Sequence, residues 1–371
     1  MRVIISAGGT GGHIYPALAI INKIKEKEPD SEFLYIGTHN RMEKDIVPAK
    51  GIPFKSIEMY GFSKKIFRNI KTVKCLFKAF KECKKMIKEF NPDIVIGVGG
   101  YVTVPVVVSA KKLGYKTFLH EQNSLPGKSN KFLSKYCDLV GVSFESSLDK
   151  FPSGKAIVTG KANDDVKVVY EAPDDALKAP VLLKSTLGLS ATKKLVLIVM
   201  GSLGAGKVSK YLESELQRFE GKDYEVLFVT GKGSYDEVMK HNYPKNVKII
   251  PFYEGLTSVM KKTDVMVSRA GASTLSELIA LEVPSILIPS PYVANNHQYL
   301  NALDLVNQNA ALMVEEKDLE DGILFKKVDE LINNEEEIKN IKSNLRKMQV
   351  KDSATVIYDN LKRIVYDEKN K

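Results

Sequence analysis

Cysteine is scarce in this chain of 371 residues and is not arranged for a disulfide or a metal. The three cysteines are Cys75, Cys83 and Cys137, and no two of them form a Cys-x-x-Cys pair. An odd, sparse set of thiols argues against a disulfide framework and against a zinc site, and it is typical of a reducing cytoplasm. We therefore expect a cytoplasmic protein without a structural metal.

Long apolar runs are also absent. No window approaches the stretch of about 18 uncharged apolar residues that a membrane-spanning helix needs. Met1–Ser6 runs directly into glycines, so we expect no hydrophobic core of a signal peptide. A segment that spans a membrane is therefore not predicted.

Negative charge is in short supply in the first part of the chain. Residues 1–160 contain 26 Lys and Arg against 14 Asp and Glu, whereas the remainder contains 29 against 31. The overall net charge of +10 thus resides in the first part. A basic half beside a neutral half indicates an anionic partner, which is nucleic acid, a phospholipid surface or a phosphorylated substrate.

The length and the pattern of apolar runs predict two α/β domains. A chain of 371 residues exceeds one typical core, and its 44% apolar and 27% charged residues are ordinary for a globular protein. Short apolar runs alternate with helical patterns, which predicts doubly wound parallel sheets. The expected strands are Arg2–Ser6, Glu32–Gly37, Asp93–Gly97, Thr117–His120, Leu139–Ser143 and Ala156–Thr159, then Lys194–Met200, Glu225–Thr230, Val247–Pro251, Asp264–Ser268 and Val283–Pro289. A linker rich in Asp, Ala and Pro is expected within Lys161–Leu189, and an amphipathic helix over Ala354–Val365.

Two glycine loops imitate well-known nucleotide motifs but fail at one position each. After the first strand, Gly9-x-Gly11 would need its third glycine where Ile14 stands, and the next strand ends without an acidic residue for a ribose. Gly201–Lys207 follows the P-loop pattern until Val208, which has no hydroxyl for magnesium. We therefore expect phosphate or sugar contacts at these loops, but neither NAD binding nor ATP hydrolysis.

The segment from Ser268 to Asn301 predicts a site for a diphosphate. Gly271 allows a sharp turn after the strand, and Ser273 or Thr274 is expected to cap a helix that runs through Leu281. The amides at such a helix start, together with the helix dipole, favour a bound anion at the carboxyl edge of the sheet.

Glu277 lies one turn into this helix and has two interpretations. Its carboxylate can accept both hydroxyls of a ribose, or it can fold back in a capping box formed by Thr274-x-x-Glu277. The loop after the next strand favours the first interpretation, because it carries polar side chains that are expected at the same sheet edge. These are Asn295, Asn296, His297 and Gln298.

Several motifs together resemble the MurG family of N-acetylglucosaminyltransferases, which complete lipid II in peptidoglycan synthesis. They are GGTGGHIYPALAI (Gly8–Ile20), GVGGYVTVP (Gly97–Pro105), HEQNSLPGKSNKFLSKY (His120–Tyr136), GSLGA (Gly201–Ala205), RAGASTLSE (Arg269–Glu277) and IPSPYVANNHQYLNA (Ile288–Ala302). The resemblance covers nearly the whole chain and implies the GT-B fold, in which two Rossmann-like doubly wound domains face a cleft. It implies an acceptor- and membrane-facing domain over residues 1–163, with a C-terminal helix of about residues 352–371 packing back on it, and a UDP-sugar donor-binding domain over residues 164–351.

The resemblance also implies the reaction and its residues. It implies inverting transfer of N-acetylglucosamine from UDP-N-acetylglucosamine (UDP-GlcNAc) to undecaprenyl-linked lipid I, with His13 as the general base. The implied donor-binding residues are Thr10, Gly11, Gly12, Asn123, Ser202, Tyr253, Ala272, Ser273, Thr274, Leu275, Ser276, Glu277 and Gln298. The implied acceptor-binding residues are Gly8, Gly9, Gly99, Gly100, Tyr101 and Glu121. Neither a cofactor nor a metal is expected, because the chain lacks Asp-x-Asp, the metal clamp of the other large glycosyltransferase fold.

Three positions depart from the family pattern. Asp164 replaces an arginine that approaches the nucleotide, Leu203 replaces a glutamine, and Val104 replaces a small residue. A carboxylate near a diphosphate is repulsive, so we expect lower donor affinity unless Lys161 compensates.

The segment from Gly61 to Phe90 is strongly basic and rich in aromatic residues, with ten Lys and Arg against two Glu. Ile70, Val73, Phe77 and Phe80 have helical spacing, which an ordinary core-facing helix with a solvated basic side also explains. The mixture favours peripheral binding to an anionic membrane through Phe62–Lys81. The expected contacts are Phe62, Lys64, Lys65, Ile66, Phe67, Arg68 and Lys71.

Two other functions are alternatives to the one that the resemblance implies. One is a glycolipid synthase of the same superfamily that uses a diacylglycerol acceptor. The other is a non-enzymatic basic adaptor for a membrane or a nucleic acid, although no recognised nucleic-acid motif is present. The family reading places the protein at the cytoplasmic face of the cell membrane and implies roles in cell-wall biogenesis, cell shape and cell division.

Overall fold

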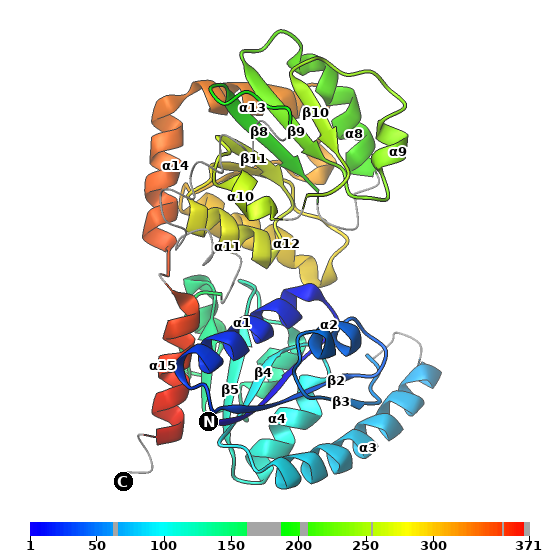
Figure 1. Ribbon diagram of the computed structural model, residues 1–371, viewed down its shortest axis with the longest axis vertical. Coiled ribbons are helices and arrows are strands. Elements are labelled where there is room, and N and C mark those ends of the chain that lie inside the picture. Colours follow the sequence, from blue (N-terminus) through cyan, green and yellow to red (C-terminus); the bar gives the residue numbers. More distant parts are fainter. Residues whose placement is uncertain (62–65, 162–186, 201–206, 254, 351, 367–371) are drawn as a thin grey trace. The chain divides into compact units, whose positions relative to one another are not determined.

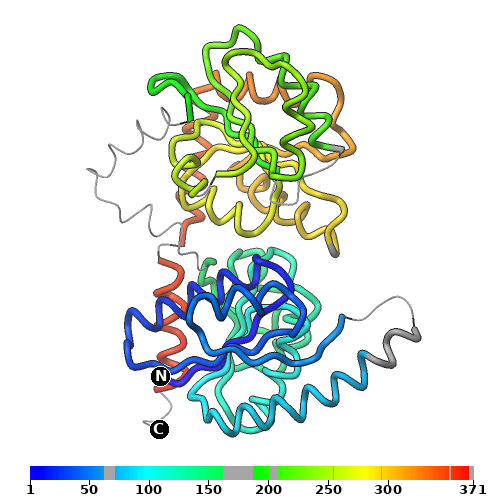
Figure 2. The backbone as a smooth tube through the Cα atoms, turned by 45° about the vertical axis from the view of Figure 1, so that its right-hand side comes forward, coloured from blue at the N-terminus to red at the C-terminus, as the bar shows by residue number. Residues whose placement is uncertain are grey.

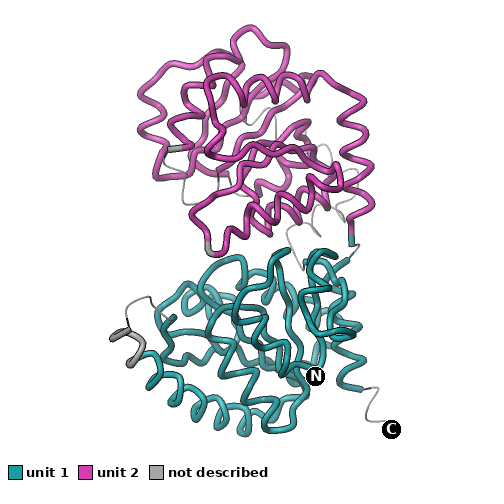
Figure 3. Tube along the Cα trace, turned by 180° about the vertical axis from the view of Figure 1, so that it is seen from behind, with its two compact units in different colours: residues 1–163, 350–371 teal, residues 164–349 magenta. Residues whose placement is uncertain are grey.

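The computed structural model describes residues 1–61, 66–161, 187–200, 207–253, 255–350 and 352–366. The chain forms two compact units, which are Met1–Asn163 together with Val350–Lys371, and Asp164–Gln349 (Figure 3). Each unit is built on one parallel sheet, so the predicted doubly wound α/β class is confirmed. Most of the predicted linker lies outside the described residues.

The sheet of unit 1 has seven strands in the order β3-β2-β1-β4-β5-β6-β7. All neighbouring pairs are parallel. The strands are β1 (Arg2–Ala7), β2 (Glu32–Thr38), β3 (Phe54–Ile57), β4 (Ile94–Gly99), β5 (Lys116–Glu121), β6 (Leu139–Val142) and β7 (Ala156–Val158). All the strands predicted for this half are present, with ends shifted by two residues at most. The edge strand β3 escapes prediction because Lys55 and Ser56, in its middle, are exposed and polar.

Helices cover both faces of this sheet (Figure 1). One face packs against α1 (Gly11–Lys27), α2 (Glu43–Ala49) and α15 (Ser353–Tyr366), and the other against α3 (Ile66–Phe90), α4 (Thr103–Lys112) and α5 (Lys128–Leu133). Within β1, Val3 and Ile5 belong to the first core and Ile4 to the second. A strand buried on both faces is a continuous apolar run, which is why these strands were predictable.

The C-terminal helix α15 belongs to unit 1 and runs beside α1 (Figure 2). Ile357 and Leu361 are fully buried in the core that α1 also lines. The Tyr358 hydroxyl donates to Glu28 Oε1 at 2.9 Å, and the Lys23 ammonium contacts the Asp352 carboxylate at 3.3 Å. The end of the chain thus completes the first domain.

The sheet of unit 2 has six strands in the order β10-β9-β8-β11-β12-β13. They are β8 (Lys194–Val199), β9 (Tyr224–Val229), β10 (Val247–Ile250), β11 (Val265–Ser268), β12 (Ser285–Leu287) and β13 (Leu312–Met313). The described helices of four or more residues are α8 (Lys207–Leu216), α9 (Tyr235–Val238), α10 (Leu256–Met260), α11 (Ala272–Leu281), α12 (His297–Asn307), α13 (Ile323–Asn333) and α14 (Glu335–Met348). Strand β12 is shorter than the predicted Val283–Pro289, since Pro284 and Pro289 carry no N–H for the ladder.

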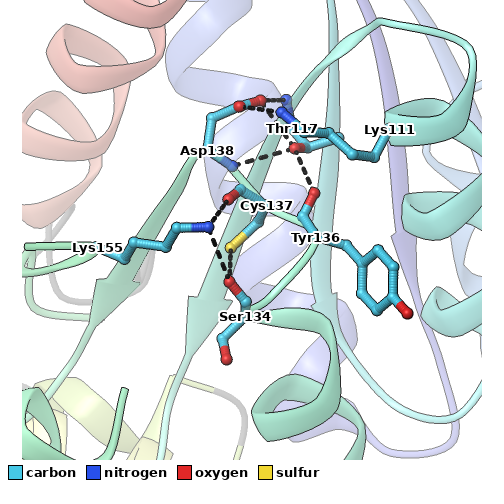
Figure 4. A network of polar contacts seen from close by, with 7 residues as sticks. All are labelled: Lys111, Thr117, Ser134, Tyr136, Cys137, Asp138 and Lys155. Carbon is cyan, nitrogen blue, oxygen red and sulfur yellow. Dashed lines mark hydrogen bonds and ion pairs between the residues drawn. The ribbon is translucent and has the colours of Figure 1, made fainter. Parts of the chain in front are cut away.

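A polar network fastens β5 to β6 at the amino edge of the unit 1 sheet (Figure 4). Asp138 accepts hydrogen bonds from Thr117 N at 2.8 Å and Thr117 Oγ1 at 2.9 Å, and it pairs with Lys111. Lys155 donates to Cys137 O at 3.1 Å. Burial opposes ionisation of Asp138, but bonds from Lys111 and Thr117 outweigh it and hold its pKa below the usual value. This network stabilises the amino edge of the sheet, and the candidate site lies at the carboxyl edge.

Candidate active site

The loop between β1 and α1 places a glycine-rich turn at the carboxyl edge of the unit 1 sheet. Gly9 has a φ of +94°, a conformation that glycine adopts without strain. Thr10 is the N-cap of α1, makes no side-chain capping bond and is exposed, and no acidic residue lies in the first turn. Gly11 and Gly12 are the first two residues of the helix. The helix therefore presents backbone amides and the positive end of its dipole at this edge, which suits an anionic or sugar ligand.

His13 lies in the first turn of α1 and bends back over the glycine loop. Its Nδ1 is 3.1 Å from the carbonyl oxygen of Gly8. Because a carbonyl only accepts, Nδ1 carries the proton of the neutral ring and Nε2 is the basic nitrogen. The histidine thus has the tautomer that a general base acting through Nε2 needs.

Two glycines at the end of β4 make room for this arrangement. Gly99 has a φ of +120° and Gly100 a φ of +91°. A Cβ on Gly99 would lie 2.6 Å from His13 Cδ2, and one on Gly100 would lie 2.6 Å from the Gly8 carbonyl oxygen. The structure therefore brings Gly8, Gly9 and His13 together with Gly99 and Gly100. Tyr101 follows them and is half-buried.

The end of β5 and the loop that follows it hold the predicted residues Glu121 and Asn123. Glu121 is buried, and its carboxylate accepts four hydrogen bonds from the following loop and from α5. The donors are Asn123 N (3.0 Å), Asn123 Nδ2 (3.1 Å), Gly127 N (2.9 Å) and Asn130 Nδ2 (3.0 Å). The structure thus gives Glu121 a role in organising this loop, and its predicted contact with an acceptor stays a prediction. Asn123 is half-buried and is oriented by Glu121.

His120, one residue earlier, received no role from the sequence beyond its motif. It is fully buried, its Nε2 is 2.9 Å from Gly160 O, and Gln122 Nε2 lies 2.9 Å from its Nδ1. Burial lowers the pKa of His120 to about 4, so the ring is neutral at physiological pH. This histidine supports the loop that carries Glu121 and Asn123.

Glu43, at the start of α2, is a further residue that sequence reasoning missed. It is fully buried at the carboxyl ends of β1 and β2. Oε1 accepts from Thr38 N (3.0 Å) and Thr38 Oγ1 (2.7 Å), and Oε2 accepts from Gly9 N (3.2 Å). Glycines at positions 8 and 37 leave room for it, since their Cβ atoms would lie 2.5 and 2.7 Å from atoms of Glu43. No local pattern marks a glutamate for burial, so only the fold reveals it.

In unit 2, the carboxyl end of β11 leads into α11 through a glycine. The N-cap is Gly271, and the helix begins at Ala272. The predicted caps, Ser273 and Thr274, instead lie in the first turn, so that part of the sequence interpretation is wrong. Leu275 N makes the first intrahelical bond, to Gly271 O at 3.0 Å. The amides of Ala272, Ser273 and Thr274 precede it at the positive end of the helix, a position that favours a bound anion.

The corrected helix start excludes the capping-box interpretation of Glu277, and the contact with a ribose stays a prediction. A capping box pairs the N-cap residue with the third helical residue, which is Thr274 here. Glu277 is the sixth helical residue and is half-buried, so it is not the capping-box glutamate. Ser276 Oγ donates to Ala272 O at 2.8 Å within the helix. Leu275 is fully buried in the core, and its amide donates a hydrogen bond to Gly271 O. A direct contact between Leu275 and the UDP-sugar is therefore not supported.

The loop after β12 and the start of α12 stabilise the turn between β11 and α11. Gln298 Oε1 accepts from Ser290 N at 2.9 Å, and the buried Asn301 donates to Ala270 O at 3.2 Å. Arg269 pairs with Glu316 at 2.9 Å and donates to Ile288 O at 3.0 Å. The glycine turn before α11 is thus held from both sides. Asn295 and Asn296 are exposed, with left-handed backbones that lead into α12.

The remaining predicted donor residues lie at other strand ends of unit 2. Tyr253 follows β10 and is half-buried, next to the exposed Phe252. Ser202, Leu203 and the P-loop-like segment Gly201–Gly206 lie outside the described residues, as do Asp164 and the membrane residues Phe62, Lys64 and Lys65. Lys161 is described, and its side chain is buried. Among described residues, no group of three or more His, Cys, Asp or Glu is arranged to hold a metal ion.

Two doubly wound parallel sheets, each with a helix that starts at a glycine turn at the carboxyl edge, have the architecture of the GT-B fold, and two family matches define the chain as a glycosyltransferase. Residues 3–142 match the glycosyltransferase family 28 N-terminal domain, and residues 195–357 match the family 28 C-terminal domain.

Comparison with individual proteins narrows the class to one family. The chain is 46% identical over 370 residues to the UDP-N-acetylglucosamine–N-acetylmuramyl-(pentapeptide) pyrophosphoryl-undecaprenol N-acetylglucosamine transferase of Bacillus cytotoxicus, covering 98% of this chain and 100% of the relative. The Bacillus licheniformis transferase of the same name is 44% identical, with full coverage of both chains. The crystal structure of Acinetobacter baumannii MurG superposes with a TM-score of 0.79 at 24% identity, over 98% of this chain and 99% of that one. The chain belongs to the MurG family.

Proposed function

We propose that this protein transfers N-acetylglucosamine from UDP-GlcNAc to the muramyl sugar of lipid I, with inversion, and thereby produces lipid II. The observation that carries the proposal is the 46% identity, over 98% of the chain, to a relative with that activity in its name. The two described sheet edges supply the groups that this chemistry requires.

In the proposed reaction, the acceptor hydroxyl attacks the anomeric carbon of the donor sugar. Its proton passes to His13 Nε2, a bond forms between the acceptor oxygen and the anomeric carbon, and the bond from that carbon to the UDP oxygen breaks. The Nδ1–H bond to Gly8 O supports this role, because it orients the ring and leaves the basic nitrogen on the other side. The reaction therefore needs one proton acceptor and a stabilised diphosphate leaving group.

The amides of Ala272–Thr274 at the start of α11 are proposed to bind the departing diphosphate. Glu277, one turn into the same helix, is proposed to accept the ribose hydroxyls, with Gln298 and Tyr253 completing the donor site. The N-terminal amides of α1 and Asn123 are proposed to contact the transferred sugar. Gly8, Gly9, Gly99, Gly100 and Tyr101 are proposed to line the acceptor site.

The decisive assay measures UDP release from UDP-GlcNAc with and without lipid I. We expect release that depends on lipid I and a disaccharide product with inverted anomeric configuration. Release that instead depends on diacylglycerol would establish the glycolipid synthase. Absence of release with either acceptor, by protein whose fold is intact, would favour the non-enzymatic adaptor.

The exposed face of α3 supports peripheral binding to an anionic membrane. Phe77 is 73% exposed and Val73 is 40% exposed, whereas Cys75 is buried and Cys83 lies in the core. The helix therefore presents apolar side chains outward among exposed lysines, namely Lys74, Lys78 and Lys81. This differs from the ordinary core-facing alternative, although Phe80 does pack inward. The side chains of Ile66, Phe67, Arg68 and Lys71 lie outside the described residues.

A second exposed aromatic residue extends this proposal to α5. Phe132 is 48% exposed, and Lys128, Lys131 and Lys135 around it are exposed. Both α3 and α5 pack beside α4 on the same face of the sheet. In the described part of the chain, no helix combines the length and apolar character needed to cross a bilayer. We propose that these two surfaces bind the cytoplasmic face of the cell membrane, where a lipid-anchored acceptor resides.

A further inference from the structure

The peptide group that joins Gly8 to Gly9 is hydrogen-bonded at both of its ends. Its carbonyl oxygen accepts from His13 Nδ1 at 3.1 Å, and its N–H donates to Glu43 Oε2 at 3.2 Å. These two polar groups belong to one planar, conjugated unit. A single peptide group therefore connects a buried carboxylate to the imidazole of the proposed general base.

Such a connection has electrostatic consequences. Hydrogen bonds in series polarise one another, so a carboxylate at the N–H end makes the carbonyl a stronger acceptor at the other end. A stronger acceptor holds the Nδ1–H tautomer more firmly, and the nearby negative charge stabilises the imidazolium that forms when Nε2 takes up a proton. Glu43 can thus influence His13 without touching it.

Glu43 is built into the fold as a carboxylate and is not merely accommodated there. Its two oxygens receive three donors, and the side chain is fully buried. A Cβ at Gly8 would lie 2.5 Å from Oε1, and one at Gly37 would lie 2.7 Å from Cγ. Burying a carboxylate is costly unless hydrogen bonds compensate it. An apolar side chain would fill the same space at lower cost if packing were the only requirement.

The other titratable groups on the elements around this arrangement either have hydrogen-bond partners of their own or are exposed. From β2, the Tyr35 hydroxyl donates to Ala7 O at 3.1 Å, and burial followed by the Glu43 charge raises its pKa well above the usual value. From β4, the neighbours of His13 and Gly8 are Gly99 and Gly100, which carry no charge. From β5, His120 contacts Gly160 O and Gln122, and Glu121 accepts from Gly127 N and Asn130 Nδ2. On α2, Lys44 and Asp45 are exposed.

We propose that Glu43 is a positioning residue that acts through the Gly8–Gly9 peptide to orient His13 and to raise the basicity of its Nε2. The proposal rests on the proposed function only for the statement that His13 is the base. No proton moves along this connection: the Gly9 amide keeps its proton, and the proton from the acceptor hydroxyl remains on His13 Nε2 until it leaves to solvent.

The first test needs neither donor nor acceptor. Long-range proton–nitrogen NMR spectra of the uniformly ¹⁵N-labelled full chain report the tautomer and the titration of each of its five histidines, and His13→Ala assigns the His13 signals. We expect the neutral His13 ring to be protonated on Nδ1. In Glu43→Gln we expect the His13 titration midpoint to fall by about 1 pH unit, because a nearby negative charge is lost. A wild-type ring protonated on Nε2 would overturn the proposal without any variant.

Thr38→Val is the matched control for that experiment. It removes the 2.7 Å bond from Thr38 Oγ1 to Glu43 Oε1 but keeps the carboxylate and a side chain of similar shape. We expect its His13 midpoint to stay within about 0.2 pH unit of wild type, since the charge is unchanged. An equal shift in Thr38→Val and Glu43→Gln would mean that the effect is structural, and it would overturn the relay.

The second test uses the UDP-release assay with lipid I. Glu43→Gln should lower kcat about 10- to 100-fold, because a less basic and less firmly oriented His13 loses part of the contribution of a positioned general base, about 10²–10⁴-fold. The KM for UDP-GlcNAc should be nearly unchanged. The acidic limb of its pH–rate profile should move down with the His13 midpoint. In a His13→Ala background the same substitution should change kcat less than twofold, because its route of action is gone. A full additional loss in that background would refute the relay.

The two tests separate the failure of this inference from the failure of the proposed function. A wild-type protein that releases no UDP with lipid I would refute the function, while the NMR titration would still decide the relay. An active wild type whose His13 midpoint is the same in Glu43→Gln would refute the relay and leave the function standing.

Discussion

A Cβ atom on Gly100 would lie 2.6 Å from the carbonyl oxygen of Gly8, which is the oxygen that His13 Nδ1 contacts at 3.1 Å. The backbone at the end of β4 therefore packs closely against the carbonyl oxygen that orients His13. Because Gly100 has a φ of +91°, a side chain there is disfavoured by both the backbone and the neighbouring atom.

Gly100→Ala should consequently destabilise unit 1 and lower activity together. The left-handed backbone costs about 1–2 kcal/mol for a residue with a Cβ, and the overlap with Gly8 should add about 1–3 kcal/mol. Gly114→Ala is the matched control, since Gly114 has a φ of +85° but no atom within 4 Å of its added Cβ. Urea unfolding and UDP release measure the two effects. Equal losses in both variants would show that the contact with Gly8 is unimportant.

His13→Ala should reduce kcat about 10²–10⁴-fold, the usual contribution of a positioned general base. The KM for UDP-GlcNAc should change little, because the base contacts the acceptor hydroxyl. Steady-state kinetics with lipid I measure both constants, and calorimetry checks donor binding. A rate near wild type would assign the proton to another group. Glu121 is a poor substitute, because its carboxylate is buried under four hydrogen bonds.

Glu277→Ala should weaken the use of UDP-GlcNAc by roughly 10- to 150-fold, equivalent to about 1.5–3 kcal/mol for lost charge-assisted bonds to a ribose. Stability should hardly change, since Glu277 is not the capping-box residue of α11. Glu330→Ala, which removes a glutamate with 63% side-chain exposure from another helix of unit 2, is the control for an ordinary helical glutamate. Isothermal titration with UDP-GlcNAc and thermal melting decide the outcome. Normal donor affinity with a lower melting temperature would contradict the ribose assignment.

His120 should make the protein less stable in mild acid. Its pKa is about 4 in the folded chain and about 6.5 when unfolded, so between these values the unfolded state binds one more proton. The free energy of unfolding should therefore fall as the pH drops from 6.5 towards 4, by about 2–3 kcal/mol from this group. His120→Gln should lack that component. Urea midpoints at pH 7 and pH 4.5 compare the two proteins, and parallel losses would exclude His120 as the cause.

The exposed face of α3 should bind vesicles that contain anionic lipid, because each lysine near the surface adds about 1 kcal/mol. Binding should weaken with salt, because salt screens this electrostatic attraction. Phe77→Ser should reduce sedimentation with such vesicles, and so should the joint replacement of Lys64, Lys65, Arg68 and Lys71 by Glu. Met239→Ser, at an apolar residue of unit 2 that is 49% exposed, is the control. Equal binding of all variants to neutral and anionic vesicles would contradict the membrane proposal.

Local signals in the sequence determined the fold class and the main loops of the site. The strands that were predicted in both sheets are short apolar runs, since a parallel strand covered on two faces needs apolar side chains on both. Glycine loops after β1, β4 and β11 marked the carboxyl edges, and motif order indicated the MurG family, which the comparisons confirm. These features depend on neighbours along the chain, so reading the sequence was sufficient. The individual donor and acceptor contacts stay predictions.

Only the tertiary structure decided features that depend on distant neighbours. In α3, two faces are apolar enough to be the core face. Packing against β1, β2, β4 and α4 selected the face that carries Ala79 and Cys83, leaving Val73 and Phe77 exposed. In α11, serine and threonine are the better N-caps by propensity, but the turn after β11 places Gly271 at that position. Glu43 is 34 residues from Gly9, and a buried carboxylate becomes favourable only where the fold assembles its three donors. Hydrogen bonds between strand ends are set by the sheet order β2-β1-β4, which no local pattern encodes.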